Sequence, residues 1–295
     1  MAETEEDTLS LTIWGVRGSI PAPGRATVRY GGETTCFEVR AGPHTLVIDC
    51  GSGARACGRA LARRGIDQLD ILFTHTHMDH ICGLPFFCLA YDPTVEVNLW
   101  GGHLPEGSTF EEIVERMMSP PIFPVATSAL NNTYFRRFHG GDPITLGCGL
   151  TVSSTRLNHP GNCCGYRIDW RGSSIAIITD HEHGNPKMDA AVAAFVAGVD
   201  VMIYDAMYLD TEYPRFVGWG HSTPTHALAL AAKAGVTMPV IFHHDPDRTD
   251  DALDALRADL VRQMPTAEVA RERMTITLRN GERIDAPEAA FAAPA

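Results

Sequence analysis

The sequence predicts an α/β protein in which two β-sheets pack against each other and helices cover the outside. Short apolar segments rich in β-branched residues recur along the chain and end at glycine or polar turn residues, as strands do. In each half of the chain these segments are followed by helical patterns. A hydrophobic fraction of 44% lets a chain of 295 residues bury a sizeable core. Because each sheet must bury an apolar face, packing two sheets together satisfies this order of elements.

The first half of the chain combines predicted strands with short helices. Strands are expected at 9–16, 45–49, 70–74 and 95–100. Helices are expected from Gly51-Ser52-Gly53 to about Arg64, at 83–90, and at 108–118. For the last helix, Ser108 and Glu111 have the spacing of a capping box, and Pro120 ends it. We expect a loop from there to Asn132.

The second half repeats this rhythm. Strands are expected at 150–156, 163–169, 174–179, 200–204, 238–243 and 274–279, and helices at 187–197, 224–234 and 249–262. The sequence shows no short-period repeat and no low-complexity linker. We therefore expect a single domain over 1–295, in which the proline-rich segment 101–135 forms a lid or a pocket wall.

Composition narrows the classes of function. The formal net charge is −12, and the chain has no dense run of Lys and Arg, which disfavours a dedicated nucleic-acid binder. No apolar run approaches the roughly 20 residues of a membrane helix, and the acidic N-terminus does not resemble a signal peptide. These features predict a cytoplasmic protein without a membrane partner. The eight cysteines form no CxxC pair, so we expect buried free thiols.

The strongest functional signal is the string HTHMDH at 75–80, directly after a predicted strand. Alternation along an extended chain places His75, His77 and Asp79 on one side, and a bend after Asp79 brings His80 to them. Imidazole and carboxylate groups together suit Zn, Mn or Fe. Other candidate ligands also follow predicted strands, where α/β scaffolds place functional residues. They are His159, Asp180 and His243.

This pattern resembles the HxHxDH signature of metallo-β-lactamase-fold hydrolases, whose later His, Asp and His occur in the same order. The resemblance covers roughly residues 11–260 and implies an αββα sandwich of two mixed sheets, with the metals at one edge. It implies two divalent ions, with Zn²⁺ expected first and Mn²⁺ or Fe²⁺ as alternatives. The implied ligands are His75, His77 and His159 for one ion, and Asp79, His80 and His243 for the other, with Asp180 as the bridge. Such a pair lowers the pKa of a shared water towards roughly 7, and the resulting hydroxide attacks the substrate.

Other motifs resemble the branch of this family near tRNase Z and the small-molecule phosphodiesterases. They include WGVRGSIP at 14–21 and RYGGETTC at 29–36. The string GHST at 220–223 is similar to a tRNase Z motif whose His donates to the scissile phosphate, which implies this role for His221. Asp205 falls where tRNase Z carries a Glu, and the resemblance implies that it orients His221. Together with Asp79, these two residues are the expected catalytic side chains.

Several side chains have two interpretations at this stage. Asp49 is expected to orient a ligand imidazole or to cap a helix. Arg17 is expected to bind phosphate or to pair with an acid. His181, His183 and His244 are alternative contacts for metal or substrate.

The absence of long basic arms and the acidic composition favour a small phosphodiester substrate, such as a cyclic nucleotide. The main hypothesis is therefore a dinuclear phosphodiesterase. Alternatives are a tRNA 3′-processing endonuclease acting on RNA, and a lactone, thioester or amide hydrolase of the same fold. The remaining alternative is a non-hydrolytic metal sensor or a diiron redox protein. The sequence leaves the oligomeric state open, and a homodimer is the assembly considered because dimers are the commonest homo-oligomers.

Overall fold

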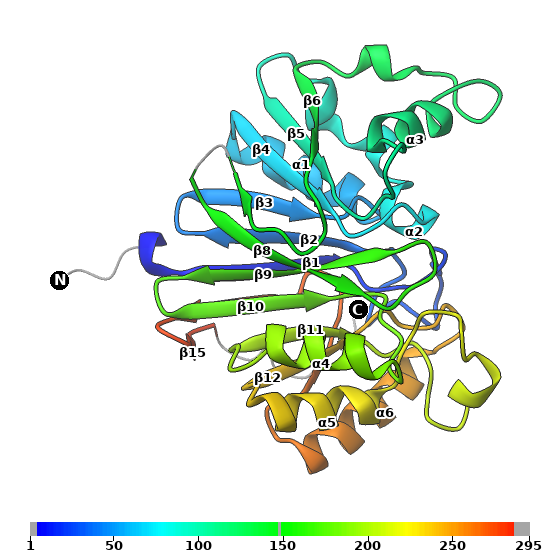
Figure 1. The fold of residues 1–295 in the computed structure, drawn as a ribbon, viewed down its shortest axis with the longest axis vertical. Coiled ribbons are helices and arrows are strands. Elements are labelled where there is room, and N and C mark those ends of the chain that lie inside the picture. Colours follow the sequence, from blue (N-terminus) through cyan, green and yellow to red (C-terminus); the bar gives the residue numbers. More distant parts are fainter. Residues whose placement is uncertain (1–4, 147–148, 286–295) are drawn as a thin grey trace.

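Two mixed β-sheets lie against each other, and helices cover their outer faces (Figure 1). The computed structural model describes residues 5–146 and 149–285. The first sheet has the strand order β15-β14-β1-β2-β3-β4-β5-β6. Its antiparallel strands are β15 (Glu282–Arg283), β14 (Thr275–Arg279), β1 (Leu9–Gly15), β2 (Cys36–Ala41) and β3 (His44–Ile48). The parallel strands β4 (Gln68–Phe73), β5 (Glu96–Gly101) and β6 (Thr133–Arg137) continue it from β3.

The second sheet has the order β13-β12-β11-β10-β9-β8-β7. Antiparallel pairing joins β7 (Ile144–Thr145), β8 (Thr151–Leu157), β9 (Cys163–Trp170) and β10 (Ser173–Ile178). Parallel pairing then adds β11 (Val201–Asp205), β12 (Met238–Phe242) and β13 (Glu268–Val269). Since β10, β11 and β12 are parallel, the residues that follow them emerge at one edge of this sheet.

The core between the sheets is formed by the inward-facing residues of both. Leu11 and Phe37 from the first sheet belong to the same buried cluster as Ile175 and Val240 from the second. On the outer faces, α1 (Ala54–Arg64) and α3 (Phe110–Met117) cover the first sheet, and α4 (Pro186–Phe195), α5 (Pro224–Ala234) and α6 (Asp250–Gln263) cover the second. The predicted class, two mixed sheets packed together with helices on the outside, is confirmed. None of the helices among the described residues combines the length and apolarity needed to cross a bilayer.

Some local predictions shift or fail. The helix predicted at 108–118 is capped by Thr109 and Glu112, one residue later than expected, because Thr109 is extended and its hydroxyl accepts from the backbone N–H of Glu112. The prediction of a helix at 83–90 is wrong. Two 3₁₀ turns, η2 (Leu84–Phe86) and η3 (Cys88–Tyr91), occupy this stretch because Phe87 between them is extended. The strands β2 and β6 were not predicted.

The segment 101–135 divides between the core and the surface. Its helix α3 buries Phe110 and Val114 against the first sheet, and its last residues enter β6 at the sheet edge. The loop after α3 leaves Ile122 71% exposed. The seven described cysteines are free thiols, most of them buried, and Cys148 lies outside the described residues.

Candidate functional site

The predicted ligand residues follow four strands that end at the same edge of the sandwich. Residues 75–80 follow β4 and run into the short helix α2 (Met78–Ile81), whereas His159, Asp180 and His243 follow β8, β10 and β12. The φ angles of Asp180 and His243 are +46° and +61°. A positive φ is strained for residues other than glycine, and such strain concentrates at functional sites.

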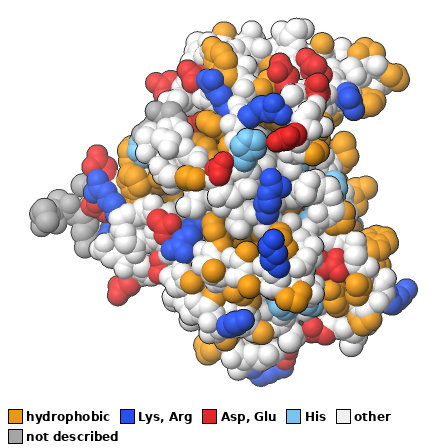
Figure 2. All heavy atoms as spheres, viewed as in Figure 1, with side chains coloured by type: hydrophobic (Ala, Val, Ile, Leu, Met, Phe, Trp, Pro, Cys, Tyr) orange, Lys and Arg blue, Asp and Glu red, His pale blue; other side chains and the backbone are white. Residues whose placement is uncertain are grey.

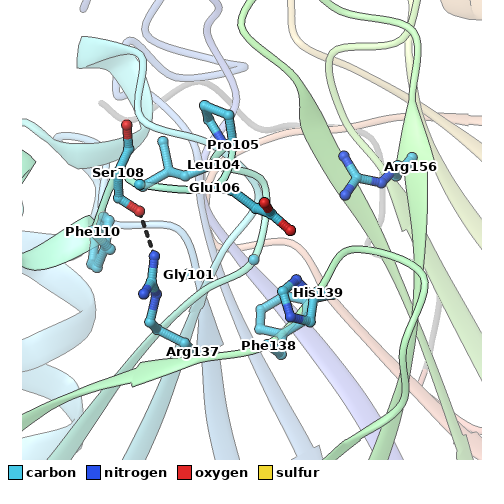
Figure 3. Close-up of a pocket in the computed structure, with 12 residues that line it drawn as sticks. Gly101, Leu104, Pro105, Glu106, Ser108, Phe110, Arg137, Phe138, His139 and Arg156 are labelled. Atoms are coloured by element: carbon cyan, nitrogen blue, oxygen red, sulfur yellow. Dashed lines mark hydrogen bonds between the residues drawn. The ribbon is translucent and has the colours of Figure 1, made fainter.

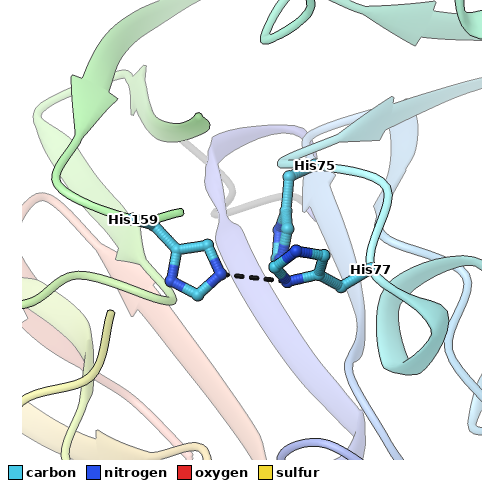
Figure 4. Close-up of side chains that lie close together, drawn as sticks. All are labelled: His75, His77 and His159. Carbon is cyan, nitrogen blue, oxygen red and sulfur yellow. Dashed lines mark hydrogen bonds between the residues drawn. The ribbon is translucent and has the colours of Figure 1, made fainter. Parts of the chain in front are cut away.

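The first group of side chains is His75, His77 and His159, which point toward one another (Figure 4). His159 Nε2 lies 3.0 Å from His77 Nδ1. Asp180 Oδ2 faces this group, at 3.6 Å from His75 Nε2 and 3.8 Å from His159 Nε2. Burial lowers the pKa of all three imidazoles, which favours the neutral form that binds metals.

The second group is Asp79, His80, Asp180 and His243, all buried. Asp180 Oδ1 lies 3.3 Å from Nε2 of both His80 and His243. Asp79 Oδ2 lies 3.4 Å and 3.3 Å from the same two nitrogens. The two oxygens of Asp180 therefore face different groups of histidines.

The donor atoms of both groups fit divalent cations. Within the described part of the chain, buried atoms at this site have no hydrogen-bond partner, namely Nε2 of His75, Nε2 of His80, both ring nitrogens of His243, and Oδ1 of Asp180. Each unpaired buried polar atom costs about 1–3 kcal/mol, so this arrangement needs a further partner. Imidazole nitrogens and carboxylate oxygens suit Zn, Mn and Fe alike, so the donor set does not select among them.

His221 and Asp205 form a hydrogen-bonded pair beside these groups. His221 Nδ1 lies 2.7 Å from Asp205 Oδ2, and the His221 ring stacks on that of His243 with centroids 4.8 Å apart. Asp205 ends β11 and is fully buried. Burial opposes a charge on His221, but the carboxylate of Asp205 outweighs this effect and raises the pKa of His221 to about 9.

Residues 44–244 match the family model described as Beta-lactamase superfamily domain, which spans more than half of the chain. The chain belongs to the metallo-β-lactamase-fold superfamily. It is 30% identical over 323 residues to a ribonuclease Z of Lachnoclostridium phytofermentans, covering 92% of this chain and 98% of that protein. It is 26% identical over 318 residues to a ribonuclease Z of Gemmatimonas aurantiaca, with 89% and 95% covered.

Solved structures show the same fold at lower identity. The metallo-β-lactamase-fold protein YhfI of Bacillus subtilis matches with a TM-score of 0.69 and 17% identity, over 92% of this chain and 99% of that one. A diphosphatase of the PhnP family matches with a TM-score of 0.66 and 19% identity, over 92% and 97%. The short form of human tRNase Z matches with a TM-score of 0.62 and 18% identity, over 90% and 98%. The fold expected from the HxHxDH resemblance, and the branch near tRNase Z, are thereby confirmed.

In this metallo-β-lactamase-fold chain, Asp49 orients His80. Its Oδ2 lies 2.7 Å from His80 Nδ1, and it also accepts from the backbone N–H and the hydroxyl of Thr74. The capping interpretation is wrong, because Gly53 occupies the N-cap of α1. With Nδ1 held in this way, Nε2 of His80 faces the second group.

The glycine-rich turn at 14–21 lies against the same site. The backbone N–H of Ser19 donates to Asp79 Oδ2 at 2.7 Å. A Cβ at Gly18 would lie 2.5 Å from the ring of His243, so the close approach requires glycine here. Arg17 matches neither earlier interpretation, because its guanidinium donates to the backbone carbonyls of Gly31, Asp245 and Arg248.

The three histidines considered as alternative contacts, His181, His183 and His244, lie outside the two groups of side chains. His181 accepts a hydrogen bond from the backbone N–H of Asn158, and His183 stacks on His226 with centroids 4.3 Å apart. His244 Nε2 donates to the buried backbone carbonyl of Ala270 at 2.8 Å. Their side chains therefore support the loops around the site.

Glu182 is a residue that the sequence analysis missed. Its two carboxylate oxygens accept the backbone N–H groups of Gly218 and Gly220, each at 2.7 Å. The carbonyl of Gly220 in turn accepts from His159 Nδ1 at 2.9 Å, which leaves Nε2 facing the first group. The acid stands directly after Asp180 and His181, but its partners lie 36 and 38 positions away. The string HEH at 181–183 was the only signal for it.

A polar pocket of about 370 Å³ lies between the segment 101–110, the segment 137–139 and Arg156 of β8 (Figure 3). Its lining includes the guanidinium groups of Arg137 and Arg156, the imidazole of His139 and one acid, Glu106. Figure 2 shows basic and acidic side chains scattered over the visible face, without one continuous basic stretch. The pocket is thus a local concentration of basic groups on an acidic protein.

Proposed function

We propose that this protein is a metal-dependent phosphodiester hydrolase that cleaves RNA, as the name of its ribonuclease Z relatives implies. This was the alternative in the sequence analysis, where a small phosphodiester was the first choice. The observation that carries the proposal is the Asp205–His221 pair, held at 2.7 Å beside seven converging metal-binding side chains. Full-length similarity to ribonucleases supports RNA as the substrate.

We assign two ion sites to these side chains. His75, His77 and His159 would hold one ion with Oδ2 of Asp180, and Asp79, His80 and His243 would hold the other with Oδ1. When bound, such ions polarise the phosphate and lower the pKa of water. The chain contributes their spacing, because the single carboxylate of Asp180 faces both sites.

His221 serves as the proton donor in this proposal. Asp205 holds Nδ1, so Nε2 of the imidazolium faces the space beside His159 and Asp180. A proton at Nε2 can be given to the oxygen that leaves the phosphorus, which is the task of a general acid. Asp205 receives further hydrogen bonds from the backbone N–H groups of His181 and Met207, which fix its position.

The polar pocket supplies a second argument for RNA. Arg156 lies on β8, three residues before His159, so the pocket adjoins the first ligand group along the strand. His103, next to Gly102 of the pocket lining, contacts the hydroxyl of Thr76 at 3.2 Å, between two of the ligand histidines. The guanidinium groups in this pocket suit a further phosphate of a longer strand, which a cyclic mononucleotide lacks.

Cleavage assays test the proposal directly. The metal-loaded protein is incubated with a precursor tRNA that carries a 3′ extension, with single-stranded RNA, with cyclic AMP and with bis(p-nitrophenyl) phosphate, each with and without a chelator. We expect chelator-sensitive cleavage of RNA, abolished by His77→Ala and preserved in His44→Ala, whose side chain lies at the start of β3 outside the site. Efficient hydrolysis of cyclic AMP without RNA cleavage would favour the small diester instead.

A further inference from the structure

Trp219 is presented to solvent in a way that the other tryptophans are not. Its side chain is 61% exposed, and among the described residues its indole N–H has no hydrogen-bond partner. The other three indoles donate to acceptors within the protein, at Glu38, Asp70 and the carbonyl of Glu6, from Trp14, Trp100 and Trp170 respectively. Exposing a large apolar side chain is unfavourable in water, so burying this indole against a ligand or a partner would be favourable.

The backbone on both sides of Trp219 is held rigidly. Gly218 and Gly220 have φ angles of +92° and +90°, and Glu182 accepts both of their N–H groups. The N–H of Trp219 itself donates to the carbonyl of Phe216 at 3.0 Å. A side chain on such a fixed turn loses little backbone freedom when it binds, which favours a recognition role.

The turn is also part of the candidate active site. Gly220 accepts the Nδ1 hydrogen of His159, and His221 follows immediately. The Cα atoms of Trp219 and His221 are therefore at most about 7 Å apart. A group that stacks on the indole lies next to the phosphate that His221 contacts in the proposed reaction.

A row of aromatic rings contacts Trp219. The ring of Phe216 contacts the indole edge-on, with centroids 5.4 Å apart and an interplanar angle of 80°. Phe216 stacks in turn on Tyr208 at 4.3 Å, and Tyr208 contacts His221 edge-on at 5.8 Å. This row of rings connects the indole of Trp219 to the candidate acid His221, and the indole itself stays exposed.

We propose that Trp219 stacks on the nucleobase that adjoins the scissile phosphate of a single-stranded RNA. The inference rests on the proposed function and extends it, because it makes an unpaired base part of the substrate. A base in a duplex is stacked on its neighbours, whereas a base in a single strand is free to stack on an aromatic side chain. Contact with a second protein copy is the competing use of this surface, since the neighbouring Val217 is also 63% exposed.

Kinetics on RNA hexamers test the role of the base. One hexamer is cleaved intact, and others carry one abasic ribose at successive positions around the cleavage site. For the wild type, we expect about a 10-fold loss of kcat/KM at one flanking position. Trp219→Leu should show about the same loss on the intact hexamer, mainly through KM, and no additional loss on that abasic substrate. Trp219→Phe should keep most of the wild-type kcat/KM on the intact hexamer, because phenylalanine also stacks on a base. Val217→Ala is the matched control on the same loop.

A binding measurement gives a readout that is independent of turnover. We expect 5′-AMP to quench the tryptophan fluorescence of the wild type more strongly than ribose 5-phosphate does, and this difference to disappear in Trp219→Phe. Equal abasic penalties in the wild type and in Trp219→Leu would overturn the stacking role. So would losses shared by Val217→Ala and accompanied by a change of oligomeric state in sedimentation. If no phosphodiester is hydrolysed, including bis(p-nitrophenyl) phosphate, the proposed function fails. The fluorescence measurement still tests whether a nucleobase binds at Trp219.

Discussion

The two halves of the candidate metal centre are held in different ways. On one side, His80 is oriented by the buried carboxylate of Asp49, which follows a strand of the first sheet. On the other side, His159 is oriented by the carbonyl of Gly220, in a loop that Glu182 holds in place. The first half thus depends on the core of a sheet, and the second depends on a loop. Because this loop also carries His221, changes to it should affect both metal binding and proton transfer.

Removing the shared carboxylate should break both halves at once. Asp180→Ala takes away the oxygens that face the two groups of histidines. We expect a loss of activity greater than the roughly 100-fold that is typical of residues behind the ligands, with reduced binding of both ions. Activity and metal content by mass spectrometry check this. Full occupancy of both sites in the variant would contradict the bridging role.

Removing the proton donor should separate catalysis from metal binding. His221→Ala is expected to lower kcat by about 10²–10⁴-fold, the range of general acid–base catalysis, with the metal content unchanged. Asp205→Asn should lower kcat in the same direction by a smaller factor, because the amide still holds the ring without stabilising its charge. An effect confined to KM would show that His221 only binds substrate.

Removing Asp49 should weaken the sheet-held half selectively. Asp49→Ala deletes the partner of His80 Nδ1 and should lower the affinity for one ion by about 10–100-fold, while the other ion stays bound. Metal titration followed by calorimetry distinguishes the two sites. Equal weakening of both ions would show that the halves do not act separately.

Loosening the loop should have the smallest effect and should sharpen the contrast. Glu182→Gln keeps the shape, but its amide oxygen can accept only one of the two glycine N–H groups, because the NH2 group that replaces the other oxygen is itself a donor. We expect about a 10-fold decrease in kcat/KM, at the lower end of the range for groups behind the ligands, and faster hydrogen exchange in 206–222. Glu115→Gln, on the exposed side of α3, is the matched control. Unchanged exchange in the variant would argue against Glu182 as the residue that orders this loop.

The sequence by itself determined the class of the fold and most ligand candidates. Strands such as β1, β10 and β12 are predicted by local apolar patterns, which depend on neighbouring residues alone. The segment 75–80 predicts its metal-binding side chains because alternation and one bend act within six positions. His159, Asp180 and His243 were found since each follows a predicted strand, and strand ends meet at one edge of the sheets.

Only the tertiary structure decided how these side chains are paired and oriented. The direction of each oxygen of Asp180, the Asp49–His80 and Gly220–His159 contacts, and the contact of Glu182 with two glycines join residues that lie between 31 and 61 positions apart, or across the two sheets. Likewise, Arg17 bonds backbone carbonyls more than 200 positions away. Local patterns carry no information about such partners, because packing of the two sheets and the loop between β11 and α5 brings them together.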